Sequence, residues 1–81
     1  DYDKSLEYYN DVLKTAEEKE YLHMQVTSLT FIGVALRLSG NTEAALVSLN
    51  KADKIALPKD FYLRTHIYEE IVATYIGQKD Y

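Results

Sequence analysis

His66 and Glu70 are the first pair of residues whose types and spacing could do chemistry. They lie four residues apart, which places an imidazole and a carboxylate on one face of a helix, as in some zinc sites. Two ligands do not complete a metal site, and the other histidine, His23, falls in a different expected helix. We therefore expect neither a metal site nor any other cofactor.

The paired carboxylates Glu17-Glu18 are the next candidates, since two carboxylates can serve as a general acid and a general base. That role requires an apolar pocket that shifts a pKa, and the stretch from Glu17 to Glu20 is charged throughout. The sequence also contains no glycine-rich phosphate loop and no nucleophile with an evident partner base. We interpret these carboxylates as surface charge and expect no enzyme activity.

Composition limits the remaining classes of function. The 81 residues can form one domain at most, and 47% of them are hydrophobic, which argues against disorder. The basic residues are scattered along a chain of net charge -4, so this segment is not expected to bind nucleic acid. The longest apolar run, Phe31 to Leu36, is too short to span a bilayer. The absence of cysteine fits a reducing, cytoplasmic compartment.

Apolar residues recur at spacings of three and four, which predicts amphipathic helices over residues 3–18, 21–39, 42–56 and 60–78. The first two should be separated by a break near Lys19 or Glu20. Gly40 suits the left-handed position after the second helix, and Asn41 or Thr42 can cap the third, which ends at Pro58. The expected inner face of helix 3–18 is Leu6, Tyr9, Val12 or Leu13, and Ala16, and that of helix 21–39 is Leu22, Val26, Leu29, Ile32, Gly33 and Leu36. The expected inner face of helix 42–56 is Ala45, Leu46, Leu49, Ala52 and Ala56, and that of helix 60–78 is Phe61, Tyr68, Ile71, Val72 and Tyr75.

Two further patterns concern exposure. Phe31, Val34 and Leu38 form a second apolar strip on helix 21–39, so this helix should be covered on more than one side. The chain also has eight tyrosines. We expect four of them on core faces: Tyr2, Tyr9, Tyr68 and Tyr75. The other four should lie nearer the surface: Tyr8, Tyr21, Tyr62 and Tyr81.

The helices repeat with a period of about forty residues. Overlaying the first helix on the third pairs Ser5 with Ala45, Leu6 with Leu46, Tyr9 with Leu49 and Val12 with Ala52. Overlaying the second helix on the fourth pairs Leu29 with Tyr68, Ile32 with Ile71, Gly33 with Val72 and Leu36 with Tyr75. Residues 1–20 would be the second helix of a preceding repeat, 21–58 a complete helical hairpin, and 59–81 the first helix of a following repeat. Gly33, with Ala45 and Ala52, should mark the closest approach of two helices.

The middle unit resembles a tetratricopeptide repeat. The residues that follow this family's pattern are Leu29, Ile32-Gly33 and Leu36 on one helix, the Gly40-Asn41 turn, and Ala45, Leu49 and Ala52 on the next helix. The period is nearer forty than the family's usual thirty-four, as in the peptide-pheromone receptors of Gram-positive bacteria. The resemblance implies an all-α fold, a section of a right-handed α-solenoid with four antiparallel helices. It also implies a scaffold or adaptor that binds a protein or peptide partner.

In that family the first helix of each hairpin lines a groove that binds a peptide. Here those helices would be 21–39 and 60–78. Arg37 could pair with a carboxylate of the partner, and Glu69-Glu70 with a basic side chain. The lysine and asparagine clamp of chaperone-binding members is absent from these positions, so binding of chaperone tails is not expected. The candidate binding residues are Thr27, Thr30, Val34, Arg37, His66, Glu69, Glu70 and Ala73.

Two alternatives to binding remain open. The candidate residues could be ordinary solvated surface, and the repeats would then be purely structural or self-associating. If Thr30, Arg37 and Glu69 pack against the chain's own helices, the binding interpretation for this section fails. The sequence looks like a piece of a longer chain, so helix 60–78 should leave part of its Ile71, Val72 and Tyr75 surface open. A head-to-tail contact with the first helix of another copy would cover that surface and form a homo-oligomer.

Overall fold

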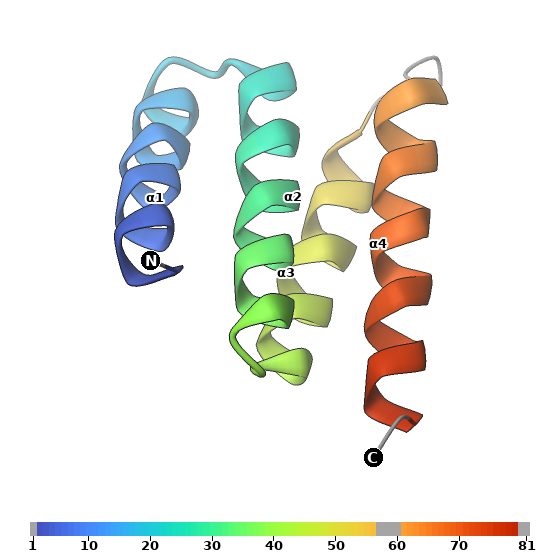
Figure 1. Cartoon of the computed structure of the whole chain (residues 1–81). Coiled ribbons are helices and arrows are strands. Elements are labelled where there is room, and N and C mark those ends of the chain that lie inside the picture. Colours follow the sequence, from blue (N-terminus) through green and yellow to red (C-terminus); the bar gives the residue numbers. More distant parts are fainter. Residues whose placement is uncertain (1, 57–60, 80–81) are drawn as a thin grey trace.

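The computed structural model describes residues 2–56 and 61–79, and these form four α-helices (Figure 1). The helices are α1 (Tyr2–Glu18), α2 (Leu22–Leu38), α3 (Thr42–Ile55) and α4 (Phe61–Lys79). The all-α prediction is confirmed, and the boundaries agree with the expected ones to within a residue or two wherever they are described. The expected stop at Pro58 and the expected helix start at residue 60 lie outside the described residues.

The turns after α1 and after α2 have the same hydrogen bonds. After α2, the amides of Gly40 and Asn41 donate to the carbonyls of Arg37 and Leu36, and Gly40 has a φ of 93°. After α1, the amides of Glu20 and Tyr21 donate to the carbonyls of Glu17 and Ala16, and Glu20 has a φ of 57°. Both are Schellman turns, in which a left-handed residue ends the helix. The predicted break near Glu20 is confirmed.

Asn41 occupies the N-cap position of α3, as expected, but its side chain makes no capping hydrogen bond. Its Nδ2 instead donates to the Ser39 hydroxyl, at 3.4 Å, so it helps to hold the turn.

The shared turn geometry yields a prediction, because Glu20 stands where Gly40 stands in the second turn. A left-handed conformation is unfavourable for any residue with a Cβ, so Glu20→Gly should raise the free energy of unfolding by about 0.4–1 kcal/mol. Gly40→Ala should lower it by about 1 kcal/mol, since an added Cβ meets nothing within 4 Å and only the backbone is strained. Urea unfolding followed by circular dichroism measures both. Changes of the same sign would contradict the shared geometry.

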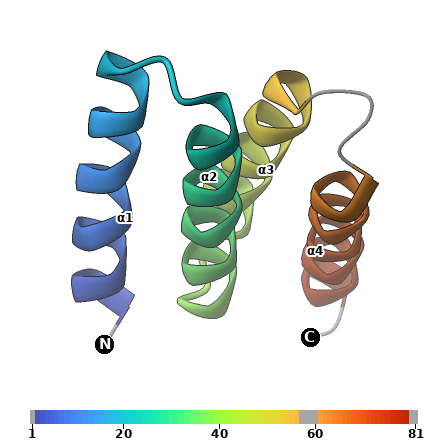
Figure 2. The same cartoon turned by 90° about the horizontal axis from the view of Figure 1, so that it is seen from above.

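The helix at the centre of the arrangement is α2. It packs against α1, α3 and α4, whereas α1 contacts only α2 among the described residues. Seen from above, α2 and α4 lie side by side, α3 lies behind them, and α1 flanks α2 on the side away from α4 (Figure 2). This arrangement places α2 and α4 on a common surface, as the groove prediction requires.

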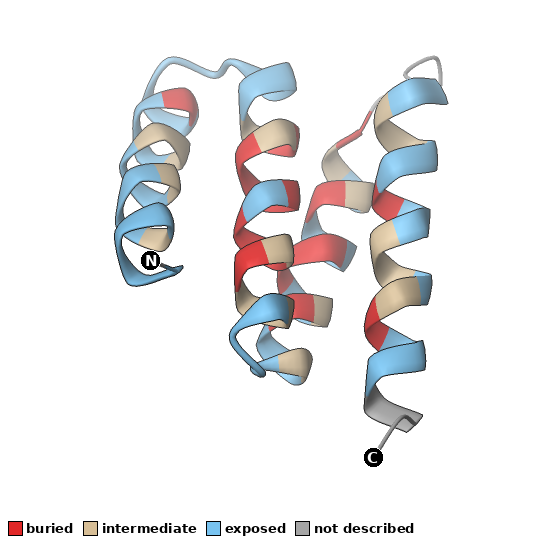
Figure 3. Ribbon diagram, in the orientation of Figure 1, coloured by how far each residue is buried: buried red, intermediate tan, exposed pale blue. Residues whose placement is uncertain are grey.

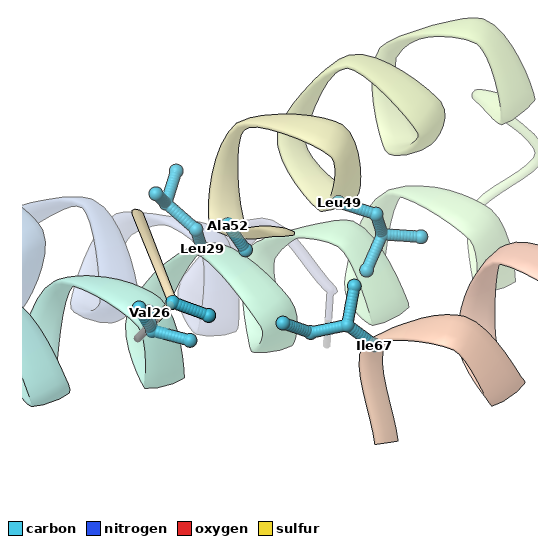
Figure 4. Close-up of a cluster of buried hydrophobic side chains, with 6 residues drawn as sticks. Val26, Leu29, Leu49, Ala52 and Ile67 are labelled. Atoms are coloured by element: carbon cyan, nitrogen blue, oxygen red, sulfur yellow. The ribbon is translucent and has the colours of Figure 1, made fainter. Parts of the chain in front are cut away.

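The core lies mainly between α2 and α3, where the buried residues of Figure 3 concentrate. Figure 4 shows Ile67 of α4 pointing toward Leu49 of α3, and both side chains are fully buried. The close approach expected at Gly33 is present, because a Cβ added there would lie 2.6 Å from Cγ of Leu49. The core cluster consists of Val26, Leu29, Leu49, Ala52, Ala56 and Ile67.

The expected inner face of α4 is wrong. Phe61, Tyr68, Val72 and Tyr75 are exposed, and Ile71 is half-buried. The buried residues are Ile67 and Thr74, which lie one helical position away from that face. The physical reason is that α4 meets α2 and α3 on one side only, and no described helix packs on its other side.

Two smaller expectations also need correction. Tyr2 and Leu22 are exposed, because each begins a helix at an end where no described segment covers it. Among the other tyrosines, Tyr9 is half-buried as expected, and the surface prediction is confirmed for Tyr8, Tyr21 and Tyr62. Tyr81 lies outside the described residues.

Candidate partner-binding surface

Four rings form a continuous row across three helices. The Tyr9 ring of α1 stacks on Phe31 of α2, with centroids 5.1 Å apart and an interplanar angle of 13°. Tyr8 meets Tyr9 edge to face at 5.2 Å, and His66 of α4 lies 6.4 Å from Phe31 in a tilted arrangement. We call Tyr8, Tyr9, Phe31 and His66 the ring row. Stacked and edge-to-face rings attract one another, so these contacts help to hold α1, α2 and α4 together.

The ring row crosses the face of α2 that points away from the core. Thr27, Phe31, Val34 and Leu38 recur at helical spacing on this face, and Phe31 remains 41% exposed. Helix α2 is contacted from three sides, as predicted, but the strip of Phe31 and Leu38 is not the covered part. Phe31 and Tyr9 are not among the binding residues predicted from the sequence, and Tyr8 is predicted only to lie near the surface.

Arg37 and Glu70, two of the predicted binding residues, pair with each other. Arg37 Nη2 donates a hydrogen bond to Glu70 Oε1 at 2.8 Å, which joins α2 to α4. Their side chains are 25% and 17% exposed, so the pair is largely shielded from water. Arg37 Nε is buried and has no acceptor in the described part of the chain. The pair therefore acts as a link between two helices, and the charges expected to meet a partner neutralise each other.

Thr30 lies outside the exposed surface. It is buried, and its hydroxyl donates to the Val26 carbonyl of its own helix at 2.8 Å. Thr74 of α4 makes the same kind of bond to the Glu70 carbonyl at 2.7 Å. Threonine hydroxyls are commonly satisfied in this way inside helices. Thr30 and Arg37 are thus both engaged within the protein, whereas Glu69 is exposed.

The remaining predicted residues stay accessible to different degrees. Thr27, Val34 and Ala73 are half-buried, and His66 and Glu69 are exposed. Glu69 lines a shallow hollow of 380 Å³ together with Thr65, Tyr68 and Val72. The accessible surface formed by α2 and α4 therefore contains Thr27, Phe31, Val34, His66 and Ala73, with Glu69 at its edge.

Arg64 fixes the other side of α4. Its Nη2 lies 3.5 Å from Asp53 Oδ1 of α3 and donates to the Tyr68 hydroxyl at 2.9 Å. The hydrogen bond with Tyr68 raises the pKa of Arg64 above its ordinary value, and the charge of Asp53 raises it further. Arg64 therefore keeps its positive charge at any physiological pH and cannot act as a proton donor.

The described residues contain no group of three or more histidine, cysteine or acidic side chains that could hold a metal ion. Glu70, the potential partner of His66 in such a site, is bonded to Arg37 instead. None of the helices in the described ranges is both long enough and apolar enough to cross a membrane.

Comparison with known proteins finds no matching family model, no matching curated protein and no matching solved structure. The surface itself therefore indicates the function: a row of accessible rings on α1, α2 and α4 lies next to an internal ion pair.

Proposed function

We propose that the four helices are a section of a tetratricopeptide-like α-solenoid that binds a peptide or protein partner across α2 and α4. Two features support this proposal. The helices recur after about forty residues, with α1 and α3 starting at Tyr2 and Thr42 and α2 and α4 at Leu22 and Phe61. The first helices of the two hairpins, α2 and α4, also lie side by side. In a right-handed solenoid, such helices form the inner wall on which extended partners bind.

The observation that carries the proposal is the ring row. A single exposed apolar side chain needs no explanation, but rings gathered from α1, α2 and α4 form a contiguous patch. Rigid aromatic side chains are frequent anchors of protein interfaces, because they offer a large contact area and lose little conformational entropy. Phe31 is at the centre of the row. We therefore expect an apolar or aromatic side chain of the partner to contact Phe31.

The Arg37–Glu70 pair supports this choice of chemistry. An ion pair that is satisfied within the protein offers no net charge to a partner, and breaking it would leave a partly buried charge uncompensated. Recognition by charge at this position is therefore unfavourable. The pair instead links α2 to α4 and helps to hold His66 beside Phe31. The partner should accordingly be selected by shape and apolar contact.

A peptide-display selection against the 81-residue chain tests the proposal. Phe31→Ala should raise the dissociation constant of the selected peptides at least about tenfold, the effect of losing one interface anchor. The matched control is Val47→Ala, because Val47 is 69% exposed on α3, away from the ring row, and should leave binding unchanged. Both variants must first show the circular dichroism spectrum of the parent. Selected peptides that bind Phe31→Ala as tightly as the parent chain would refute the proposed site.

The second candidate function, a repeat segment that associates with itself, is favoured by a different observation: the exposed apolar face of α4.

A further inference from the structure

A row of large apolar side chains runs along the side of α4 that no described helix covers. Phe61 is 75% exposed and Val72 is 55% exposed, and Tyr68 and Tyr75 are also exposed. We call Phe61, Tyr68, Val72 and Tyr75 the open face of α4. It borders the hollow of 380 Å³ that Thr65 and Glu69 complete. An apolar row of this length is typical of a surface that packs against another helix.

The corresponding face of α2 is covered by α3. Counting from the first residue of each helix, Tyr68 and Val72 of α4 correspond to Leu29 and Gly33 of α2. Gly33 approaches Leu49 of α3, and the Leu29 carbonyl accepts a hydrogen bond from the Ser48 hydroxyl at 2.7 Å.

The rest of the two helices corresponds as well. Ile67 and Thr74 are buried, and so are their counterparts Ser28 and Ala35. Helix α4 therefore has the same two packing faces as α2, and only one of them is covered.

Helix α1 shows the complementary feature. Counting from the first residue again, Ser48 and Ala45 of α3, which meet α2, correspond to Tyr8 and Ser5 of α1. Ser5 is exposed, and Tyr8 is 63% exposed. Two adjoining hollows follow the line between α1 and α2 here. One has a volume of 370 Å³ and is lined by Tyr8, Asp11, Val12, Thr15 and Met24; the other has a volume of 220 Å³ and adds Tyr9, His23, Thr27 and Ser28 to Tyr8, Val12 and Met24.

We propose that a second copy of this chain docks its open face of α4 on the hollows between α1 and α2. Helix α4 of one copy would then pack on α1 and α2 of the other copy in the way that α2 packs on α3 and α4 within a single chain. No new type of contact is needed. The occupant is a second copy because the chain carries both halves of this interface, and each half is the counterpart of a surface that its own helices bury.

The register of this contact follows from the internal one. Because Ser48 meets Leu29, Tyr8 of one copy should meet Tyr68 of the other and enter the hollow beside it. In an antiparallel pair, Phe61 then faces the hollow near Val12 and Thr15. Phe61, the most exposed large side chain of the open face of α4, thus lies opposite a hollow between α1 and α2. Tyr8, the most exposed large side chain on the α1 side, lies opposite the hollow beside Tyr68.

A second contact of the interface would be apolar, whereas its counterpart within the chain is the Arg37–Glu70 ion pair. Arg37 of α2 corresponds to Ile76 of α4, and Glu70 of α4 corresponds to Phe31 of α2. The internal ion pair between α2 and α4 would therefore become a contact between Ile76 and Phe31 of neighbouring copies. Both side chains are exposed in the single chain, so this contact would cover Phe31 and compete with a partner bound to the ring row. Contact between them removes apolar surface of both copies from water.

The geometry is head to tail, since each copy uses α4 at one end and α1 at the other. Such a heterologous contact leaves one of each surface free in every dimer, so further copies can add. Val72 stands where the internal contact has Gly33, and its larger side chain holds the two helices further apart. The association should therefore be weaker than the packing of α2 on α3.

Sedimentation equilibrium of three variants tests the proposal. Val72→Glu blocks the α4 surface and Tyr8→Glu blocks the α1 surface, and each variant alone should have a dissociation constant at least about tenfold above that of the parent. Val47→Glu places the same new charge on an exposed valine of α3, and it should associate like the parent. The parent's average mass should rise past that of a dimer as its concentration increases.

Mixing the two blocked variants is the decisive measurement. Each retains one intact surface, so an equimolar mixture should form a heterodimer and no larger species. A parent chain that stays monomeric at millimolar concentration would overturn the proposal, and so would a mixture that stays monomeric. Self-association of Tyr8→Glu alone would indicate a symmetric contact between two α4 helices and would overturn the head-to-tail arrangement. Circular dichroism spectra must show that all variants are folded.

Discussion

Leu49→Ala should lower the free energy of unfolding by about 3–4 kcal/mol, among the largest effects of a single substitution in this chain. Leu49 is fully buried, and it fills the space above Gly33, between α2 and α4 (Figure 4). Removing three carbons there leaves a cavity that α2 and α3 cannot close, since the Ser48 hydrogen bond to Leu29 fixes their separation. Urea unfolding followed at 222 nm measures the change. Val47→Ala, on the exposed side of the same helix, should change it by less than about 0.5 kcal/mol.

The same contact predicts a reversal of sign at Gly33. In the parent chain, Gly33→Ala forces a methyl group to within 2.6 Å of Leu49 Cγ and should destabilise the fold by about 1–3 kcal/mol. In the Leu49→Ala background that obstacle is absent, and alanine's higher helix propensity should stabilise the fold by about 0.5–1 kcal/mol. The four proteins should be compared in the same concentration of trimethylamine N-oxide, which keeps the weakest of them folded. Equal effects of Gly33→Ala in both backgrounds would contradict the close approach.

Ile67→Ala is the second substitution with a large expected effect, a loss of about 3 kcal/mol. Ile67 is the only large apolar side chain of α4 that is fully buried within the described residues, and it contacts the core that α2 and α3 form. Its neighbour Tyr68 provides the control, because a truncation there removes more atoms from a side chain that is 45% exposed. Tyr68→Ala should cost less than about 1 kcal/mol. Thermal and urea unfolding of the two variants measure the difference.

This pair of variants also tests how α4 is rotated. The periodicity of the sequence places Tyr68 on the inner face, and the structure places Ile67 there. A larger loss for Tyr68→Ala than for Ile67→Ala would support the face predicted from the sequence and contradict the structure.

Much of the fold follows from local signals. Each helix shows an apolar periodicity of three and four residues, and Gly40 marks the end of α2. The break at Glu20 could be located without a glycine, because the repeat of the helices places it opposite the connection between the third and fourth. The close approach at Gly33 was also predictable, since a glycine on the inner stripe of a helix leaves room for a large side chain opposite. The helices and the turn at Gly40 depend on neighbours within a few residues, whereas the break at Glu20 was located from the forty-residue repeat.

The buried face of α4 could not be predicted in the same way. Both of its faces are apolar, with Leu63, Ile67 and Ile71 on one and Tyr68 and Val72 on the other. The overlay on α2 matches Val72 with Gly33, but the helix that covers Gly33 has no counterpart against Val72 among the described residues. Which face is buried therefore depends on which helices are present. A periodic sequence pattern contains no such information.

The proposed binding surface was only partly predictable for a related reason. The pairing of Arg37 with Glu70 joins residues in different helices, and nothing in the spacing of either charge indicates the other. Thr30 and Phe31 are adjacent in sequence, and a rotation of α2 by one position exchanges which of them is exposed. Helix periodicity locates the surface to within about one residue. The choice between a hydroxyl and a phenyl ring at its centre requires the positions of α1 and α4.

The two Schellman turns have a consequence for how such a chain can change in length. Each turn sets the direction of the next helix through hydrogen bonds among six consecutive residues, and α1 to α2 and α2 to α3 use the same bonds. One of these turns has glycine at the left-handed position and the other has glutamate. The relation between successive helices is thus specified within the turn and tolerates a change of its key residue. A helix could therefore be added or removed together with its turn without changing the hydrogen bonds of the other turn.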